Sequence, residues 1–225
     1  MLVLASASPR RRDLLAQAGY AFEVLPADIP EDPLPNEPPI AYVLRLAREK
    51  AEAVAASPAF AALPCASAEP HPILAADTTV VAPNGATLAK PENDADAARM
   101  LRLLAGATHR VITGVALLAP APTSPLTEVA AEVTWVTMLT PTEEDLARYI
   151  ATGESRGKAG AYAIQGMAAR WIPRIHGDYF NVVGLPLALV ASMIEGVESR
   201  LRAAKELQLQ TPAAPSTRSS IPACG

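Results

Sequence analysis

The first residues that could do chemistry lie in the segment SASPRRR, residues 6–12, which follows a short apolar run at residues 2–4. The pattern predicts a strand, a tight turn and a helix, with Ser8 as N-cap and Pro9 in the first helical position. The three arginines would then lie at a helix N-terminus, where free N–H groups and the helix dipole already present positive charge. Such a cluster favours an anion such as a polyphosphate, although a solvated basic helix face is the alternative that this segment leaves open.

A single carboxylate interrupts a second apolar run. The run that begins at Ile73 reaches Asp77 and then continues as a β-branched stretch to Val81. A carboxylate within a buried strand is costly unless it is paired or binds a metal. Asp77 is therefore a candidate catalytic or metal-binding residue, and capping of a turn between two strands is the alternative.

Further positive charge and a glycine-rich stretch occur elsewhere in the chain. Lys50 lies on a predicted helix, as a surface lysine or one that reaches into a site, and Lys90 precedes a proline. The segment GESRGKAGAYAIQG, residues 153–166, matches neither the P-loop spacing nor the dinucleotide-binding fingerprint. Its glycines nevertheless let backbone amides approach a ligand closely, with Lys158 available for charge.

Composition limits the classes of function. The chain has 225 residues, of which 50% are hydrophobic, and a formal net charge of −4. This length can bury the core of one domain, and the negative charge argues against a nucleic-acid partner. Cys65 and Cys224 have no metal-ligand or disulfide pattern, and His71 is expected at the surface rather than in a metal site. No signal peptide and no apolar run of about 18–20 residues is evident, so we expect a cytoplasmic protein without a membrane partner.

The elements that must position these residues follow from periodicity and turn signals. We expect residues 1–204 to form one domain and residues 205–225 to be a disordered C-terminal tail. The Asn84-Gly85 pair predicts a hairpin turn. Strands are predicted at residues 2–4, 22–25, 73–81, 108–118 and 128–139, with further β-structure in 171–183. Helices are predicted after Ser8 and at residues 40–54, 94–104, 142–150 and 185–194 with a charged extension; loops are predicted at 27–39, 57–72 and 120–125.

Six motifs together resemble the Maf family, the so-called septum formation inhibitor proteins. They occur in the family's order between Leu2 and about Met193, which makes the resemblance specific. The motifs are LASASPRRRDLL, YVLRLAREKA, the strand ending AADT, the Lys90-Pro91 pair, HRVITGVAL, and GKAGAYAIQG followed by NVVGLP.

The resemblance implies an α/β fold similar to that of inosine triphosphatase. A long, curved mixed sheet with flanking helices would form two lobes around a central cleft. The implied activity is hydrolysis of a nucleoside triphosphate substrate between its α and β phosphates, with a divalent cation, Mg²⁺ or Mn²⁺, as cofactor. Relatives in this family are often dimers, so a homodimer is open to this chain.

The family's site residues map onto matching positions. Asp77 matches the proton acceptor that activates water, and Glu31 matches an acidic loop residue near the metal, so both are candidate metal ligands. The candidate phosphate-binding residues are Ser8, Arg11, Lys50 and Lys90.

Three further positions distinguish branches of the family. Arg10, Thr78 and Gln165 together resemble the branch that acts on dTTP and UTP, including modified pyrimidine nucleotides. The 7-methyl-GTP branch typically carries tryptophan in place of the first arginine and a glutamate-bearing turn. A side-chain amide such as that of Gln165 can donate to and accept from the imide edge of uracil or thymine. The sequence alone leaves two rivals open: a nucleotide-sensing regulator of cell division, and a module that binds phosphate without recognising a nucleotide.

Overall fold

The computed structural model describes residues 1–64, 71–119 and 125–210. Its seven strands form one mixed sheet: β1 (Leu2–Leu4), β2 (Phe22–Val24), β3 (Ile73–Val81), β4 (Thr87–Leu88), β5 (Thr108–Ala119), β6 (Leu126–Thr137) and β7 (Arg174–His176). The strand order is β2-β1-β3-β5-β6-β7, and β4 pairs with β3. Strand β1 is parallel to β2 and β3, whereas the remaining pairs are antiparallel. The α/β class and the mixed sheet expected from the sequence are confirmed, and the sheet is open.

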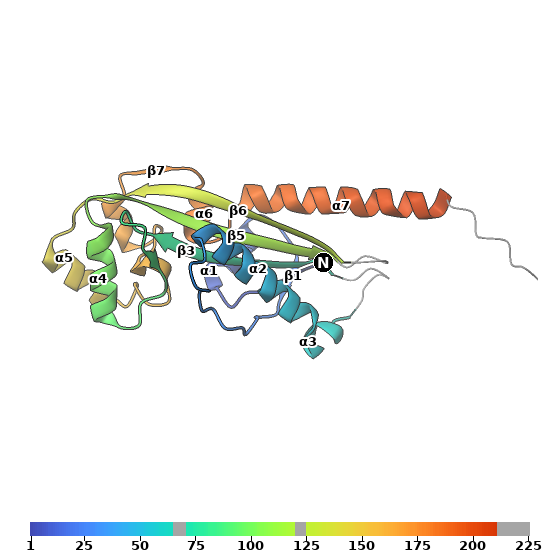
Figure 1. The fold of residues 1–225 in the computed structure, drawn as a ribbon, viewed down its shortest axis with the longest axis horizontal. Coiled ribbons are helices and arrows are strands. Elements are labelled where there is room, and N and C mark those ends of the chain that lie inside the picture. Colours follow the sequence, from blue (N-terminus) through green and yellow to red (C-terminus); the bar gives the residue numbers. More distant parts are fainter. Residues whose placement is uncertain (65–70, 120–124, 211–225) are drawn as a thin grey trace, which may run out of the picture.

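Helices flank this sheet, and Figure 1 shows α4 and α5 toward one end of the long strands, α3 toward the other end, and α1 and α2 between them. The α-helices are α1 (Pro9–Gln17), α2 (Pro39–Ala55), α3 (Pro58–Ala61), α4 (Asp94–Leu104), α5 (Glu143–Ala151), α6 (Tyr179–Val183) and α7 (Leu187–Gln210). Two 3₁₀ helices, η1 (Ala159–Ala161) and η2 (Met167–Trp171), follow α5.

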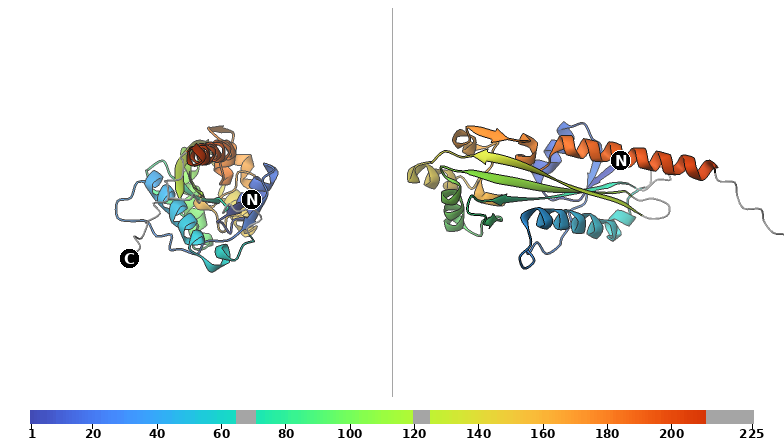
Figure 2. Two further views of the ribbon diagram at one scale, coloured as in Figure 1. Left: turned by 90° about the vertical axis from the view of Figure 1, so that its right-hand side faces the viewer. Right: turned by 45° about the horizontal axis from the view of Figure 1, so that its top comes forward.

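The side chains of β3 alternate between the two faces of the sheet and pack in a different hydrophobic cluster on each face. Ile73 and Ala75 pack in a hydrophobic cluster with residues of α2. Leu74 and Ala76 pack in the other main cluster, which contains residues of α1 and α7. Figure 2 shows α2 and α7 on opposite sides of the strands. Because successive side chains of a strand point to opposite faces, the two residues that follow Ala76 must also face opposite sides.

Several local predictions are confirmed. Ser8 caps α1 by accepting a hydrogen bond from the Arg11 backbone N–H, and the helix begins at Pro9. Gly85 has φ +86° in the turn between β3 and β4, where the Ala86 N–H donates to Asn84 Oδ1 at 3.0 Å. This is the hairpin that the Asn-Gly pair predicts.

Two segments differ from the sequence-based prediction. Residues 57–72 were expected to be a loop, but Ser57 caps the short helix α3 by accepting from the Phe60 N–H. The surface position predicted for His71 is wrong: its side chain is buried, with Nε2 3.3 Å from the Pro64 carbonyl oxygen. Phe60 and Leu63 of the same connection also pack against the hydrophobic cluster that contains residues of α2 and β3, so this part of the connection belongs to the packed domain.

The β-structure predicted for residues 171–183 is limited to β7. Gly177, at φ +127°, ends the strand, and Asp178 then caps α6 by accepting from the Phe180 N–H at 2.7 Å. The local cap therefore overrides the β-propensity of the valines that follow.

The C-terminal helix α7 continues through Gln210, past the domain boundary expected at residue 204. Residues 120–124 of the loop predicted at 120–125, the tail residues 211–225, Cys65 and Cys224 lie outside the described residues. Among the helices of the described part of the chain, none has the length and apolar composition required to cross a membrane.

Candidate active site

One cavity of about 540 Å³ opens beside β3. Its lining includes segments far apart in sequence: the β1–α1 turn, the loop before α2, the middle of β3, the loop after β4, and the turns around η1 and α6. Every site residue predicted from the sequence lines this cavity: Ser8, Arg10, Arg11, Glu31, Lys50, Asp77, Thr78, Lys90 and Gln165. The structure thus places the predicted residues together.

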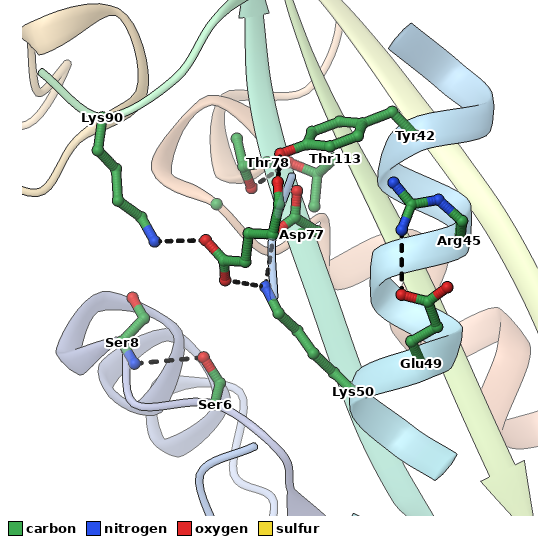
Figure 3. A network of polar contacts seen from close by, with 12 residues as sticks. Ser6, Ser8, Tyr42, Arg45, Glu49, Lys50, Asp77, Thr78, Lys90 and Thr113 are labelled. Carbon is green, nitrogen blue, oxygen red and sulfur yellow. Dashed lines mark hydrogen bonds and ion pairs between the residues drawn. The ribbon is translucent and has the colours of Figure 1, made fainter. Parts of the chain in front are cut away.

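Asp77 is one end of a chain of ion pairs that continues through Lys50 and Glu31 to Lys90 (Figure 3). Its side chain is buried, and its Oδ1 atom accepts from Lys50 Nζ at 2.7 Å. The same Nζ lies 2.6 Å from Glu31 Oε1, and Lys90 Nζ lies 2.8 Å from Glu31 Oε2. The burial cost that made Asp77 a candidate is offset by the Lys50 ammonium group, and Lys50 itself reaches inward from α2 with 7% of its surface exposed.

The approach of α2 to the sheet explains how Lys50 reaches Asp77. Gly114 on β5 is the register partner of Asp77, and a Cβ atom on Gly114 would overlap the backbone carbonyl of Val43 in α2. A glycine is therefore required for the helix to lie this close to the strands. The close approach brings the long Lys50 side chain within ion-pair distance of the carboxylate.

The next residue of β3 faces the other side of the sheet and meets the arginine turn. Arg11 donates from Nη2 to Thr78 Oγ1 at 2.9 Å and from Nε to the Gly184 carbonyl oxygen at 2.8 Å. Arg10 donates from Nε to the Val183 carbonyl oxygen at 3.2 Å. The carbonyl groups at the end of α6 thus orient both guanidinium groups, and further N–H groups on Arg11 remain available for a phosphate.

The glycine-rich turn supplies the remaining wall of the cavity. Lys158 donates from Nζ to the Glu154 carbonyl oxygen at 2.5 Å, and the Glu154 carboxylate accepts from the Met167 N–H at 2.9 Å. Gly166 packs so closely on Glu154 that a Cβ atom would overlap the carboxylate. These contacts fix both sides of the turn that carries Gln165, whose side chain is exposed to the cavity.

The electrostatics of the cavity suit a polyanion. Burial raises the pKa of Glu31, but the hydrogen bonds from Lys50 and Lys90 outweigh it and lower the pKa to about 2. Burial lowers the pKa of Arg11, and the nearby Asp77 carboxylate acts in the opposite direction. Burial also lowers the pKa of Lys158, with the charge of Arg10 adding to that effect. Cations held close together in a partly buried site favour an anionic ligand.

The carboxylates could also hold a metal ion together with a substrate. Glu31 and Asp77 both contact Lys50 Nζ, so their oxygen atoms converge on one small region. Mg²⁺ commonly binds through one or two carboxylates, water and substrate phosphates, and this donor set fits it. Within residues 1–64, 71–119 and 125–210 no group of three or more His, Cys, Asp or Glu residues is placed to hold a metal by itself.

Sequence reasoning missed some residues that complete the site. Tyr42 donates from its hydroxyl to the Glu31 carbonyl oxygen at 2.8 Å, and burial followed by the nearby Asp77 charge raises the pKa of Tyr42 to about 12. Thr113 and Asn181 lie behind Thr78 and are fully buried. In the sequence Tyr42 is one member of an apolar helical stripe, Thr113 lies inside a β-branched run, and Asn181 lies between two aromatic residues and two valines. Only their spatial neighbours distinguish them from core residues.

Comparisons with known proteins identify the family of this chain. The dTTP/UTP pyrophosphatase of Koribacter versatilis is 48% identical over 196 residues, covering 86% of this chain and 92% of the relative. The dTTP/UTP pyrophosphatase of Shigella sonnei is 47% identical over 186 residues, covering 83% and 87%. That of an Anaeromyxobacter species is 42% identical over 222 residues, covering 98% of each chain. A family model described as Maf-like protein matches residues 1–197, and the chain belongs to this family.

Proposed function

We propose that this protein hydrolyses dTTP and UTP to the nucleoside monophosphate and pyrophosphate. The observation that carries the proposal is one cavity that brings the Asp77 carboxylate together with cationic side chains from three separate segments: Arg10 and Arg11 of α1, Lys50 of α2, and Lys90 of the loop after β4. The names of the similar proteins from Koribacter and Shigella supply the substrate class.

In the proposed reaction, Asp77 takes a proton from the attacking water. The water oxygen bonds to the α phosphorus, the bond from that phosphorus to the α–β bridging oxygen breaks, and pyrophosphate leaves with the bonding electron pair. A carboxylate is suited to this role because it has acceptor oxygens within the cavity and is positioned by Lys50.

Charge neutralisation is the second requirement. Attack on a polyanion and departure of pyrophosphate both need nearby positive charge. We assign phosphate binding to Ser8, Arg11, Lys50 and Lys90, which line the same cavity as Asp77. Glu31 and Asp77 would hold a Mg²⁺ or Mn²⁺ ion, which would supply further neutralisation of the phosphate oxygens.

Selection of the base is assigned to Arg10, Thr78 and Gln165. Gln165 lies on the glycine-rich turn and lines the cavity, where its amide N–H groups can donate to a carbonyl oxygen of an imide edge. The placement of Arg10 against the end of α6 puts it on the same side of the sheet as Thr78.

A nucleotide panel tests the proposal. The purified chain is incubated with dTTP, UTP, CTP, ATP and GTP in the presence of Mg²⁺ or Mn²⁺, and pyrophosphate and orthophosphate are measured separately. We expect pyrophosphate from dTTP and UTP, loss of turnover on adding a chelator, and no turnover by Asp77→Asn. Release of orthophosphate without pyrophosphate, or turnover that is independent of Asp77, would contradict it.

A further inference from the structure

Three hydrogen bonds form a chain behind the cavity, and the groups at its two ends determine which atom donates in each bond. Arg11 Nη2 lies 2.9 Å from Thr78 Oγ1, Thr78 Oγ1 lies 2.9 Å from Thr113 Oγ1, and Thr113 Oγ1 lies 3.1 Å from the Asn181 carbonyl oxygen. A guanidinium group only donates and a carbonyl oxygen only accepts. Thr113 must therefore give its single proton to Asn181, and Thr78 must give its own proton to Thr113.

The far end of this chain is held rigidly. Asn181 donates from Nδ2 to the Val111 carbonyl oxygen at 3.1 Å and to Thr134 Oγ1 at 2.9 Å. Thr113, Thr134 and Asn181 are each fully buried. Leaving a buried carbonyl oxygen without a donor is energetically costly, which stabilises the hydrogen bond from the Thr113 hydroxyl to the Asn181 carbonyl oxygen.

The direction of the chain decides what Thr78 can offer to a ligand. Thr78 lines the cavity, whereas Thr113 is its register partner on β5 and lies behind it. Because the Thr78 proton is directed at Thr113, the hydroxyl oxygen can present only a lone pair to the cavity. It therefore accepts a hydrogen bond from a ligand and cannot donate one.

We propose that Thr113 is a positioning residue for substrate selection. Because Thr113 accepts the Thr78 proton, Thr78 is an acceptor for a hydrogen-bond donor on the nucleotide. This inference rests on the proposed hydrolysis of dTTP and UTP. Those two nucleotides share two donors that an acceptor could recognise, the imide N3–H of the base and the 3′-hydroxyl of the sugar. Cytosine has an unprotonated N3, so an acceptor that faces N3 disfavours CTP.

The variant Thr113→Val tests the role because it keeps the branched shape and removes the acceptor for the Thr78 proton. The Thr78 hydroxyl can then turn and donate to the cavity. We expect the ratio of kcat/KM for UTP to that for CTP to fall about tenfold, which corresponds to about 1.4 kcal/mol. Thr113→Ser retains the hydroxyl and should retain the wild-type ratio.

The matched control is Thr108→Val. Thr108 is on the same strand, and its Oγ1 lies 3.0 Å from that of Thr137 across the strand pair, outside the active-site cavity. This variant removes the same atoms and should leave the ratio unchanged. A general loss of stability would lower the activity toward both nucleotides and would not move their ratio.

A second substrate distinguishes the two possible donors. The second substrate is 3′-deoxy-UTP. In Thr113→Val, a changed ratio of kcat/KM for UTP to that for 3′-deoxy-UTP would identify the sugar hydroxyl as the donor. A changed ratio of kcat/KM for UTP to that for CTP would identify the imide. If folded Thr113→Val leaves both ratios at their wild-type values, the inference is overturned.

Calorimetric binding of UMP, CMP and 3′-deoxy-UMP to the same variants separates this inference from the proposed reaction. If the wild-type chain turns over neither dTTP nor UTP, the proposed function fails, while the binding ratios still test the role of Thr113. Altered ratios in Thr113→Val but not in Thr108→Val would support that role, and unchanged ratios would overturn it.

Discussion

Asp77 on β3 lies directly across from Gly114 on β5, and the missing side chain of Gly114 is what lets α2 bring a lysine to the carboxylate. The candidate catalytic residue therefore depends on a glycine of the neighbouring strand as well as on its ion-pair partner.

Gly114→Ala should destabilise the fold and disturb the site. The added methyl group would overlap the Val43 carbonyl, and overpacking of this kind costs about 1–3 kcal/mol. We expect a lower midpoint of denaturant unfolding and a loss of pyrophosphate release. Gly196→Ala is the control, because Gly196 lies within α7 with room for a Cβ atom, and alanine there should stabilise by about 0.5–1 kcal/mol. Equal stability of Gly114→Ala and the wild type would show that α2 does not need the close approach.

Lys50 and Asp77 should be strongly coupled in a double-mutant cycle. Removing the ammonium group with Lys50→Met leaves a buried carboxylate unpaired, and this cost disappears when Asp77 is already asparagine. We expect a coupling of about 1–3 kcal/mol from denaturant unfolding of the two single variants and the double variant. The ion pair of Arg102 and Glu143, whose side chains are both exposed, provides the comparison and should show a much smaller coupling. Additive effects at Lys50 and Asp77 would argue against the pair as a stabilising contact.

The stability contributed by Glu31 should depend on acid pH. The two lysines lower its pKa from the ordinary 4.5 to about 2, so the folded state binds this proton more weakly than the unfolded state. The contribution is therefore fully present above pH 4.5 and is lost as the pH falls toward 2. We expect the difference in Tm between the wild type and Glu31→Gln to shrink across that window. A difference that is constant from pH 5 to pH 2 would contradict the stabilised carboxylate.

Glu154 should support substrate selection by holding the turn that carries Gln165. Glu154→Ala removes the acceptor of the Met167 N–H. Because the turn then loses a hydrogen bond to a charged group, we expect kcat/KM for dTTP to fall about tenfold. Glu154→Gln keeps an oxygen acceptor and should retain most of the activity. Glu144→Ala, at an exposed position of α5 paired with Arg148, is the control for removing a carboxylate. The prediction fails if the alanine and glutamine variants of Glu154 have the same activity.

Much of the local structure follows from short-range rules. The Ser-Pro pair before the arginines starts α1, and the Asn-Gly pair places the turn between β3 and β4. The long apolar strands β3 and β5 are also recognisable because their β-branched runs have no competing helical period. Predictions fail where a nearby cap decides, as at Asp178, or where a residue expected in a surface loop is buried, as at His71.

The sequence by itself determined which residues are candidates for the chemistry, since an acidic residue in an apolar strand, arginines after a helix cap and six ordered motifs are visible without coordinates. The tertiary structure decided how those residues meet. Strand alternation sends Asp77 toward Lys50 and Thr78 toward Arg11, and the buried hydroxyl of Thr113 sets the direction of the Thr78 proton. No local pattern encodes these contacts, because each joins residues from separate elements that come together only when the sheet and its helices pack.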